Sequence, residues 1–530
     1  MLDIDQEKNP EILRQMAKLA VADNKRLVER IITLTEEVAQ LRGKNQQEVQ
    51  LELDRLQDQL AELRSELYGK TSERRGRRKK KGKGRKKQCG HGPKPQMDLK
   101  RVETLHSLDE ADLICPKCGG TLCEWEGQHE QSEEVDVIER TFVIRIHTKK
   151  KYHCCDCHDH VETALGPVKL IRGGRYSLDF AVEVALSKYG DHLPLERQVR
   201  MMRREGLEVS SQTLWDQVWA LTNVLRNLHG KIGDHVRSAL VICADETHWK
   251  MLDKKSKGKW YLWGASRRRA AYYEIMDSRS KEAGAQLLKD FSGTLVCDAY
   301  GVYVSLANAR EKAVQLQLEQ GDTAAARAGP GPLILACCWA HARRPFAKHE
   351  DKYPDDCSHV LDLIGKLYDV ERQVPFEPAD EDAFAKQLGL RAKLRIKVSK
   401  PIVAEIMQWA EKTTVGYLPN SKMGKGLNYL LNQRKRLEVY LDDPLVPIDN
   451  NQMERGLRNP VIGRKNFYGT KTERGAEAAA VLYSIIESCR LSLVEPKEYL
   501  RYAAHHAVEY REDPAAIPLL PHEYAAAKST

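Results

Sequence analysis

Five apolar stretches with the periodicity of β-strands lie between residues 239 and 337, and they constrain the fold more than any other part of the chain. The predicted strands are 239–244, 260–265, 271–275, 293–297 and 332–337. The second and third are separated by the spacing of a hairpin, whereas helix-like sequence precedes the fourth and the fifth. Three antiparallel strands followed by alternating helix and strand predict a mixed α/β domain.

This order of elements is typical of a ribonuclease H-like domain, which we expect to span 236–345 and 446–475. The residues between these two parts, 346–445, are helical in pattern and highly charged, without strand periodicity. We therefore interpret them as an all-α insertion. Residues 476–530 are expected to form a C-terminal helical element and a tail. The fold class is thus a multidomain α/β chain.

Three carboxylates are placed to meet in the predicted domain. We expect Asp245 to end the first strand and Asp298 the fourth, at the edge of the sheet where α/β proteins bind ligands. Glu454 lies on a later helix that can reach the same edge. Carboxylates that converge on hard cations are what two-metal phosphoryl transfer with Mg²⁺ or Mn²⁺ requires. Taken singly, each of them also fits a turn residue or a solvated ion pair.

The positive charge of the chain is concentrated in one segment. Eleven Lys or Arg and no acid lie between residues 74 and 87, whereas the net charge of the whole chain is +9. The run includes Lys79, Lys80 and Lys81. It falls in a Gly- and Pro-containing stretch, 70–100, which we interpret as a flexible basic linker that contacts nucleic acid.

The N-terminal segment, 1–69, has the pattern of a long helix. Apolar residues recur in steps of three and four from Leu27 to Leu67, with a four-residue insertion near Asn45. Such a heptad seam predicts a coiled coil. We favour a homo-oligomer of two chains, and a higher oligomer or a hairpin folded on itself is also compatible with the pattern.

Two C-x-x-C pairs predict a zinc ribbon over residues 101–165. Their thiols would supply four ligands for a closed tetrahedral Zn²⁺ site. The ligands are Cys115, Cys118, Cys154 and Cys157. Alternating apolar residues between 134 and 148 indicate strands between the two pairs. The alternative is a set of free, reduced thiols in a small β element.

Residues 166–235 are helical in pattern. A turn near Gly206, a Ser N-cap and a second helix have the layout of a helix-turn-helix, which suits either DNA contact or simple helical packing. No apolar run approaches the roughly 20 residues that cross a bilayer, and the first residues lack the pattern of a secretory signal. We therefore expect a cytoplasmic prokaryotic protein without membrane contact, associated with the nucleoid when bound to DNA.

Several motifs occur in an order that resembles a known family. The matching segments are 68–73, 115–120, 152–157, 191–195, 245–247, 297–303, 338–344, 449–458 and 462–466. Together they are similar to a transposase of the insertion-sequence sixty-six family, a branch of the DDE transposases. The resemblance implies that Asp245, Asp298 and Glu454 are catalytic. It also implies Mg²⁺-dependent cleavage at the terminal inverted repeats of the element and joining to target DNA. Small companion proteins of the same element are a further implied partner.

Basic side chains near these motifs are candidate phosphate contacts, although each also fits a solvated basic face. They are Arg343, Arg344, Arg455, Arg458, Arg464 and Lys465. Cys338 and His341 resemble a Cys-x-x-His signature of several transposase families, for which we expect a structural or DNA-positioning role. Two other functions remain compatible with the sequence: a catalytically silent DNA-binding derivative, and a metal-dependent nuclease that does not join strands.

Overall fold

The computed structural model describes residue 33 and the ranges 141–153, 161–253, 259–319, 331–374 and 381–529. The chain divides into two units, one of 1–73 with 145–530 and one of 74–144. The predicted coiled coil (apart from residue 33), the basic linker with Lys79, Lys80 and Lys81, and the four cysteines of the predicted zinc ribbon lie outside the described residues. In the second unit only residues 141–144 are described, and they form no helix or strand.

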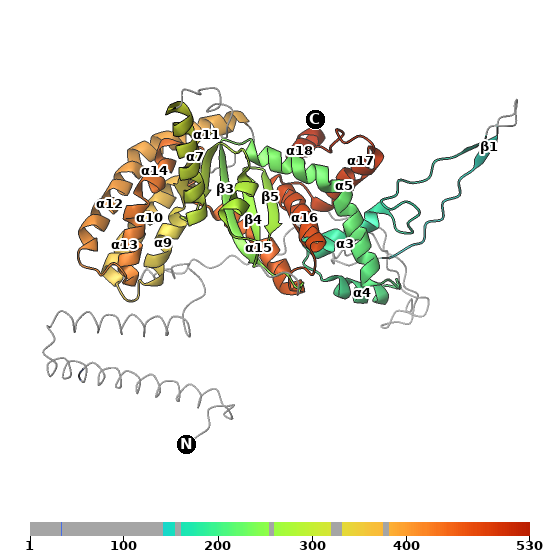
Figure 1. Cartoon of the computed structure of the whole chain (residues 1–530), viewed down its shortest axis with the longest axis horizontal. Coiled ribbons are helices and arrows are strands. Elements are labelled where there is room, and N and C mark those ends of the chain that lie inside the picture. The colour runs from blue at the N-terminus through green and yellow to red at the C-terminus, as the bar shows by residue number, and fades with distance from the viewer. Residues whose placement is uncertain are drawn as a thin grey trace, which may run out of the picture. The chain divides into compact units, whose positions relative to one another are not determined.

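A five-stranded mixed sheet organises the larger unit (Figure 1). Its strands are β3 (Val241–Trp249), β4 (Trp260–Arg267), β5 (Ala270–Met276), β6 (Gly293–Cys297) and β7 (Leu333–Cys337). The strands lie in the order β5-β4-β3-β6-β7. β3, β4 and β5 are antiparallel neighbours, whereas β6 runs parallel to β3 and β7 parallel to β6. The prediction of a mixed α/β domain is therefore confirmed.

Helices come before the sheet in the sequence and also separate some of its strands. Three helices precede β3: α3 (Leu178–Tyr189), α4 (Leu195–Arg204) and α5 (Ser211–Arg237). In the sequence, α6 (Lys281–Leu288) lies between β5 and β6, and α7 (Gly301–Glu319) lies between β6 and β7. Ser210 caps α5, because its hydroxyl accepts a hydrogen bond from the backbone N–H of Thr213 at 3.1 Å. This is the serine cap that the sequence predicts. Leu221 and Leu225 of α5 are fully buried, so one face of the helix packs in the core.

Most of the described residues between β7 and the Glu454 helix are helical, and no strand occurs among them. The elements are α9 (Trp339–Lys348), α10 (Pro354–Gln373), α11 (Glu381–Leu394), the π-helical turn η2 (Arg395–Ser399), α12 (Lys400–Thr414), α13 (Lys422–Asn432) and α14 (Arg434–Asp442). The indole N–H of Trp339 donates to the carbonyl of Leu437 at 3.0 Å, which fixes α14 against the start of α9. In Figure 1, α9, α10, α12, α13 and α14 lie together on the side of β3 away from β5, and α14 packs against β7.

Four helices end the described chain. They are α15 (Asn451–Phe467), α16 (Glu473–Leu491), α17 (Pro496–Glu509) and α18 (Pro521–Ser529). One of them, α16, packs on the opposite edge strand, β5. The hydroxyls of Ser484 and Ser488 on α16 accept hydrogen bonds from the backbone N–H groups of Tyr273 and Ala271, at 2.9 and 3.0 Å. The edge of β5 is therefore paired by helix side chains, which blocks the addition of another strand.

Two sequence expectations about strands need correction. The first strand of the sheet does not end before Asp245 but continues to Trp249, because its antiparallel pairing with β4 extends over those residues. The strand-like alternation before residue 148 does not give a strand over 141–148. Its side chains Ile144 and Ile146 are exposed, so no buried face holds them in a sheet. A short antiparallel pair follows instead, β1 (Lys151–His153) and β2 (Val161–Thr163). No helix in the described part of the chain has the length and apolar content to span a membrane.

Candidate active site

The sheet register brings the two predicted aspartates to the same level. The parallel pairing of β3 with β6 ends at Cys243 and Val296. Continued by two residues, this register sets Asp245 beside Asp298. Asp298 directly follows β6, and its carboxylate accepts a hydrogen bond from the backbone N–H of Tyr300 at 3.1 Å. Beyond Cys243, β3 stays in the sheet only through β4, so the edge opens where Asp245 and Asp298 stand.

Glu454 is delivered to this edge by the start of α15. The N-cap residue of α15, Asn450, is fully buried, and its amide donates to the carbonyl of Ala244 at 2.9 Å. The backbone N–H of Asn450 donates to the sulfur of Cys338 at 3.2 Å. These bonds tie the first turn of α15 to β3, one residue before Asp245, and to the junction of β7 and α9. Glu454 lies in that first turn.

The close approach of α15 to the sheet requires a glycine on β4. Gly264 is the residue paired with Asp245 across β3 and β4. A Cβ atom at Gly264 would stand 2.4 Å from the Cε atom of Met453 and 3.0 Å from the ring of Tyr273. The absence of a side chain therefore lets Met453, the neighbour of Glu454, pack on β4 at the residue that pairs with Asp245.

The charges of the other two acids affect the pKa of Asp245. The pKa of Asp245 is raised to about 7, mainly by burial and next by the charge of the adjacent Glu246. The charges of Asp298 and Glu454 both contribute in the same direction. A hydrogen bond of 2.9 Å from the backbone N–H of Glu246 to Asp245 opposes the shift without cancelling it. The local hydrogen bonds therefore do not fully offset the burial and the negative charges around Asp245.

The side chain of Glu246 is a fourth acid that sequence reasoning missed. It is 9% exposed and pairs with Arg279, whose Nε atom lies 2.8 Å from the carboxylate. The hydroxyl of Tyr303 lies 3.2 Å from its other oxygen. Burial raises the pKa of Glu246, while the bonds from Arg279 lower it. Its sequence position next to Asp245 was visible, but strand alternation sends it to the opposite face, and its partners lie 33 and 57 positions away.

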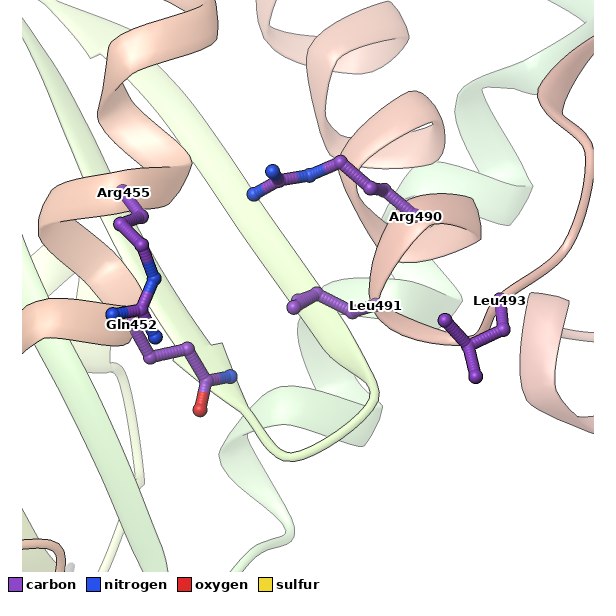
Figure 2. Close-up of a pocket in the computed structure, with 5 residues that line it drawn as sticks. All are labelled: Gln452, Arg455, Arg490, Leu491 and Leu493. Atoms are coloured by element: carbon purple, nitrogen blue, oxygen red, sulfur yellow. The ribbon is translucent and has the colours of Figure 1, made fainter. Parts of the chain in front are cut away.

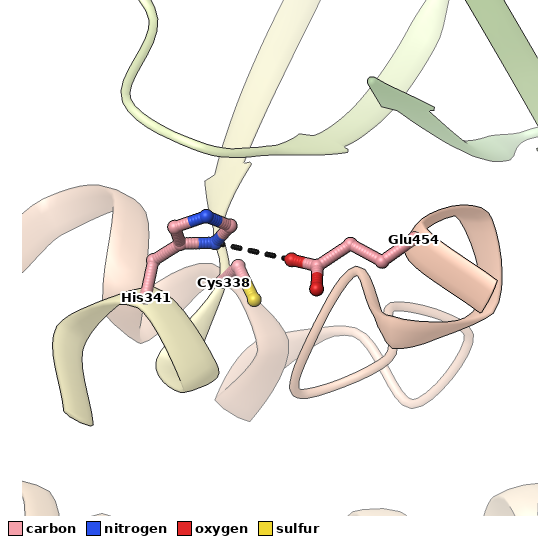
Figure 3. A group of neighbouring side chains, drawn as sticks. All are labelled: Cys338, His341 and Glu454. Atoms are coloured by element: carbon pink, nitrogen blue, oxygen red, sulfur yellow. Dashed lines mark ion pairs between the residues drawn. The ribbon is translucent and has the colours of Figure 1, made fainter. Parts of the chain in front are cut away.

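Basic and sulfur-containing groups of α9 surround Glu454 (Figure 3). One carboxylate oxygen of Glu454 lies 3.5 Å from Nδ1 of His341, and the other lies 3.9 Å from the guanidinium of Arg344. The sulfur of Cys338 belongs to the same cluster. On the other side, the guanidinium of Arg464, also on α15, donates to the hydroxyl of Thr247 at 3.3 Å. Of the predicted phosphate-binding residues, Arg344 therefore contacts Glu454 itself, and Arg464 contacts Thr247, two residues after Asp245.

The other predicted phosphate-binding residues have different neighbours or are exposed to solvent. Arg455 follows Glu454 in sequence but lines a separate hollow with Gln452, Arg490, Leu491 and Leu493 (Figure 2). Arg343 acts electrostatically on Tyr368 of α10. Arg458 and Lys465 are exposed on α15. The side chains of Arg455 and Glu454 point in different directions, because neighbouring helical positions diverge by about 100°.

The donor set at the sheet edge fits hard divalent cations. Carboxylate oxygens are the ligands that Mg²⁺ prefers, and a cation would relieve the repulsion that raises the pKa of Asp245. One oxygen of Glu454 is buried without a hydrogen-bond partner among the described residues, which leaves it available as a ligand. Asp245, Asp298 and Glu454 offer the type of ligand that such ions take, but in this structure their ligand atoms do not lie within 4.8 Å of one another as a group of three.

The amino-acid sequence is similar to those of several known proteins. The uncharacterized protein y4qI of Sinorhizobium fredii is 28% identical over 469 residues, which cover 86% of this chain and 80% of the relative. The uncharacterized protein y4hP of the same organism is 27% identical over 421 residues, covering 75% of this chain and 71% of the relative. The sequence model of the Transposase IS66 family matches residues 173–478, a range that contains Asp245, Asp298 and Glu454. The chain therefore belongs to the IS66 family of transposases, a family of enzymes that cut and join DNA.

Proposed function

We propose that this transposase cleaves DNA at the terminal inverted repeats of its element and joins the freed 3′-hydroxyl to target DNA, with Asp245, Asp298 and Glu454 as the catalytic carboxylates. The proposal rests on one observation: the charges of Asp298 and Glu454 both raise the pKa of Asp245, although the three residues are far apart in sequence. The strand order and the position of Asp298 after β6 support a ribonuclease H-like assignment of the domain.

The carboxylates would hold Mg²⁺ or Mn²⁺ ions, which when bound activate the attacking oxygen and stabilise the leaving oxygen of a phosphodiester. The residues of the chain orient the DNA and set the charge of the site. Arg344 beside Glu454 and Arg464 beside Thr247 are placed to contact phosphates on either side of the acids. Burial of the site keeps these interactions stronger than they would be in water.

The remaining parts of the chain supply binding functions in this proposal. The basic segment with Lys79–Lys81 contacts the DNA backbone, and the coiled coil pairs two subunits so that both ends of the element are held together. A Zn²⁺ ion bound by Cys115, Cys118, Cys154 and Cys157 stabilises a ribbon that, together with the helical region 166–235, reads the terminal repeats. Companion proteins of the same element join this assembly.

Strand transfer by the purified full-length chain tests the proposal. With Mg²⁺ and labelled DNA carrying the element end, the wild type is expected to yield cleaved and joined products. Asp298→Asn is expected to lose both activities by more than about a hundredfold, because it removes a metal ligand, while it still binds the DNA. Asp277→Asn, an exposed aspartate after β5, is the matched control and should keep the wild-type rate.

Three outcomes would contradict the proposal. Cleavage without joined products would indicate a nuclease, and normal joining by Asp298→Asn would remove this residue from the catalytic set. DNA binding by a wild type that neither cuts nor joins would indicate the silent derivative.

A further inference from the structure

Three different metal-binding side chains gather where α9 begins. Cys338 is the N-cap residue of α9, His341 lies one turn later, and Glu454 reaches them from α15 (Figure 3). One ligand atom from each, the sulfur of Cys338, a ring nitrogen of His341 and a carboxylate oxygen of Glu454, can be chosen so that all lie within 4.8 Å of one another. This is the only such group of three or more potential ligands among the described residues.

The spacing of these atoms is close to that of a metal site. Tetrahedral Zn²⁺ with nitrogen and oxygen ligands at about 2.0–2.1 Å and sulfur at about 2.3 Å sets ligand atoms about 3.4–3.6 Å apart. Nδ1 of His341 and the nearer oxygen of Glu454 are already 3.5 Å apart. The remaining separations need a contraction of about an ångström at most, which side-chain rotation can supply.

The hydrogen bonding of the cluster is incomplete without a further partner. Nδ1 of His341 and the facing oxygen of Glu454 are buried, and neither has a hydrogen-bond partner among the described residues. The oxygen of the fully buried Asn450 amide is unpartnered in the same way. Buried polar atoms are normally paired, so several orphans around one spot point to a missing ligand.

The backbone is arranged to stabilise a thiolate at Cys338. The N–H of Asn450 donates to its sulfur at 3.2 Å, and a backbone bond from His341 also lowers the pKa of this thiol. Burial raises the pKa of this thiol despite these two bonds.

The chemistry of the three ligands favours a borderline-soft ion. Sulfur and imidazole ligands suit Zn²⁺, whereas Mg²⁺ takes oxygen ligands and keeps much of its water. Three protein ligands leave a fourth position open for water. Glu454 is the one residue that this cluster shares with the proposed Mg²⁺ site.

We propose that Cys338, His341 and Glu454 form a second metal site, selective for Zn²⁺, and that its occupancy inhibits the transposase by withdrawing Glu454 from Asp245 and Asp298. The inhibitory part rests on the proposed function, whereas the existence of the site does not. Free zinc would thereby hold the enzyme in an inactive state, and removal of zinc would release Glu454 for catalysis.

Cobalt spectroscopy tests the site directly. The full-length chain is first supplied with enough Zn²⁺ to fill the four-cysteine ribbon, which binds tightly, and is then titrated with Co²⁺. The wild type is expected to develop a sulfur-to-cobalt charge-transfer band that saturates at one further equivalent. Cys338→Ser should lose this band, and His341→Gln should bind Co²⁺ more weakly by about tenfold or more.

Cys357→Ser is the matched control, because Cys357 is another fully buried free cysteine and lies on α10, outside the cluster. It should keep the band. Thermal unfolding shows whether each variant folds, and His341→Gln decides the question if Cys338→Ser does not. The absence of a Cys338-dependent band, or equal Co²⁺ affinity in all variants, would overturn the site.

Inhibition is measured separately, with Mg²⁺-supported DNA cleavage in buffers of defined free Zn²⁺. The four-cysteine ribbon is kept filled throughout, and each rate is expressed relative to the rate of the same variant at the lowest free Zn²⁺, so basal differences do not enter. Wild type should lose activity over the Zn²⁺ range that displaces Co²⁺, and His341→Gln should need about tenfold more zinc. Cleavage that persists with the site filled would refute the inhibition. A wild type that is inactive at the lowest free Zn²⁺, with the ribbon filled, would refute the proposed function instead, and the Co²⁺ titration would still decide the site.

Discussion

Among single residues, Asp245 carries the clearest conflict between stability and activity. Its carboxylate is partly buried among Glu246, Asp298 and Glu454, and its pKa is raised to about 7. When such a group ionises, the folded state becomes less stable relative to the unfolded chain, in which the pKa is near 4. The cost is absent below pH 4, grows as the pH rises through this window and is complete above pH 7.

Asp245→Asn is therefore expected to stabilise the metal-free protein at pH 8 while it abolishes strand transfer. The gain is roughly 1–3 kcal/mol, less than the full shift implies because the side chain is only partly buried. Thermal unfolding with a chelator at pH 8 and pH 5 measures it, and the gain should shrink at the lower pH. Asp277→Asn should show no such gain. An unchanged or lower Tm for Asp245→Asn at pH 8 would contradict the electrostatic picture.

At the scale of elements, the contact between α15 and β4 sets the position of Glu454. Gly264→Ala is expected to destabilise the protein by about 1–3 kcal/mol, because the new methyl group meets Met453 and Tyr273. It should also slow DNA cleavage, since α15 must shift away from the strand that pairs with Asp245.

The double variant Gly264→Ala, Met453→Ala distinguishes this contact from a general effect of alanine in a strand. Removal of the Met453 side chain gives the methyl group room, so the double variant should lose less stability than the sum of the two single variants. Urea unfolding of all four proteins gives the coupling free energy. Strict additivity would show that the two positions do not press on each other.

Sequence reasoning located most of these elements and fewer of the contacts between them. The apolar stretches of β4 to β7 and the turn at Asp298 are local patterns, and the structure has them where they were expected. The extension of β3 past Asp245 depends on pairing with β4, which no local pattern reports. The role of Glu246 depends in the same way on Arg279 and Tyr303. The divergence of Arg455 from Glu454 required the orientation of α15 on the sheet.

At the scale of the whole molecule, the helices between β7 and α15 contain a buried ion pair that we expect to control their stability. Arg395 is fully buried and forms two hydrogen bonds of 2.8 Å to Glu371. Glu371→Gln keeps the shape but leaves a buried guanidinium without its counter-charge, which should destabilise the protein by about 3 kcal/mol or more. Differential scanning calorimetry would measure the loss.

Glu411→Gln provides the comparison, because Glu411 pairs at 3.1 Å with Arg434 on the surface, where both side chains are about half exposed. A pair of this kind contributes at most about 1 kcal/mol, so the Tm should barely move. Equal effects of the two substitutions would indicate that burial of the Arg395 pair has no special energetic role.

The serine hydroxyls that pair with the edge of β5 have a consequence for synthesis on the ribosome. Ser488 follows Ala271, its partner on the strand, by 217 positions. At about 5–20 residues per second, translation needs about 10–40 s to cover that distance. During this interval the edge of β5 in the nascent chain is unpaired. A polypeptide truncated before α16 would keep this unpaired edge permanently. Such fragments should therefore aggregate or be degraded, rather than accumulate as competitors of the finished enzyme.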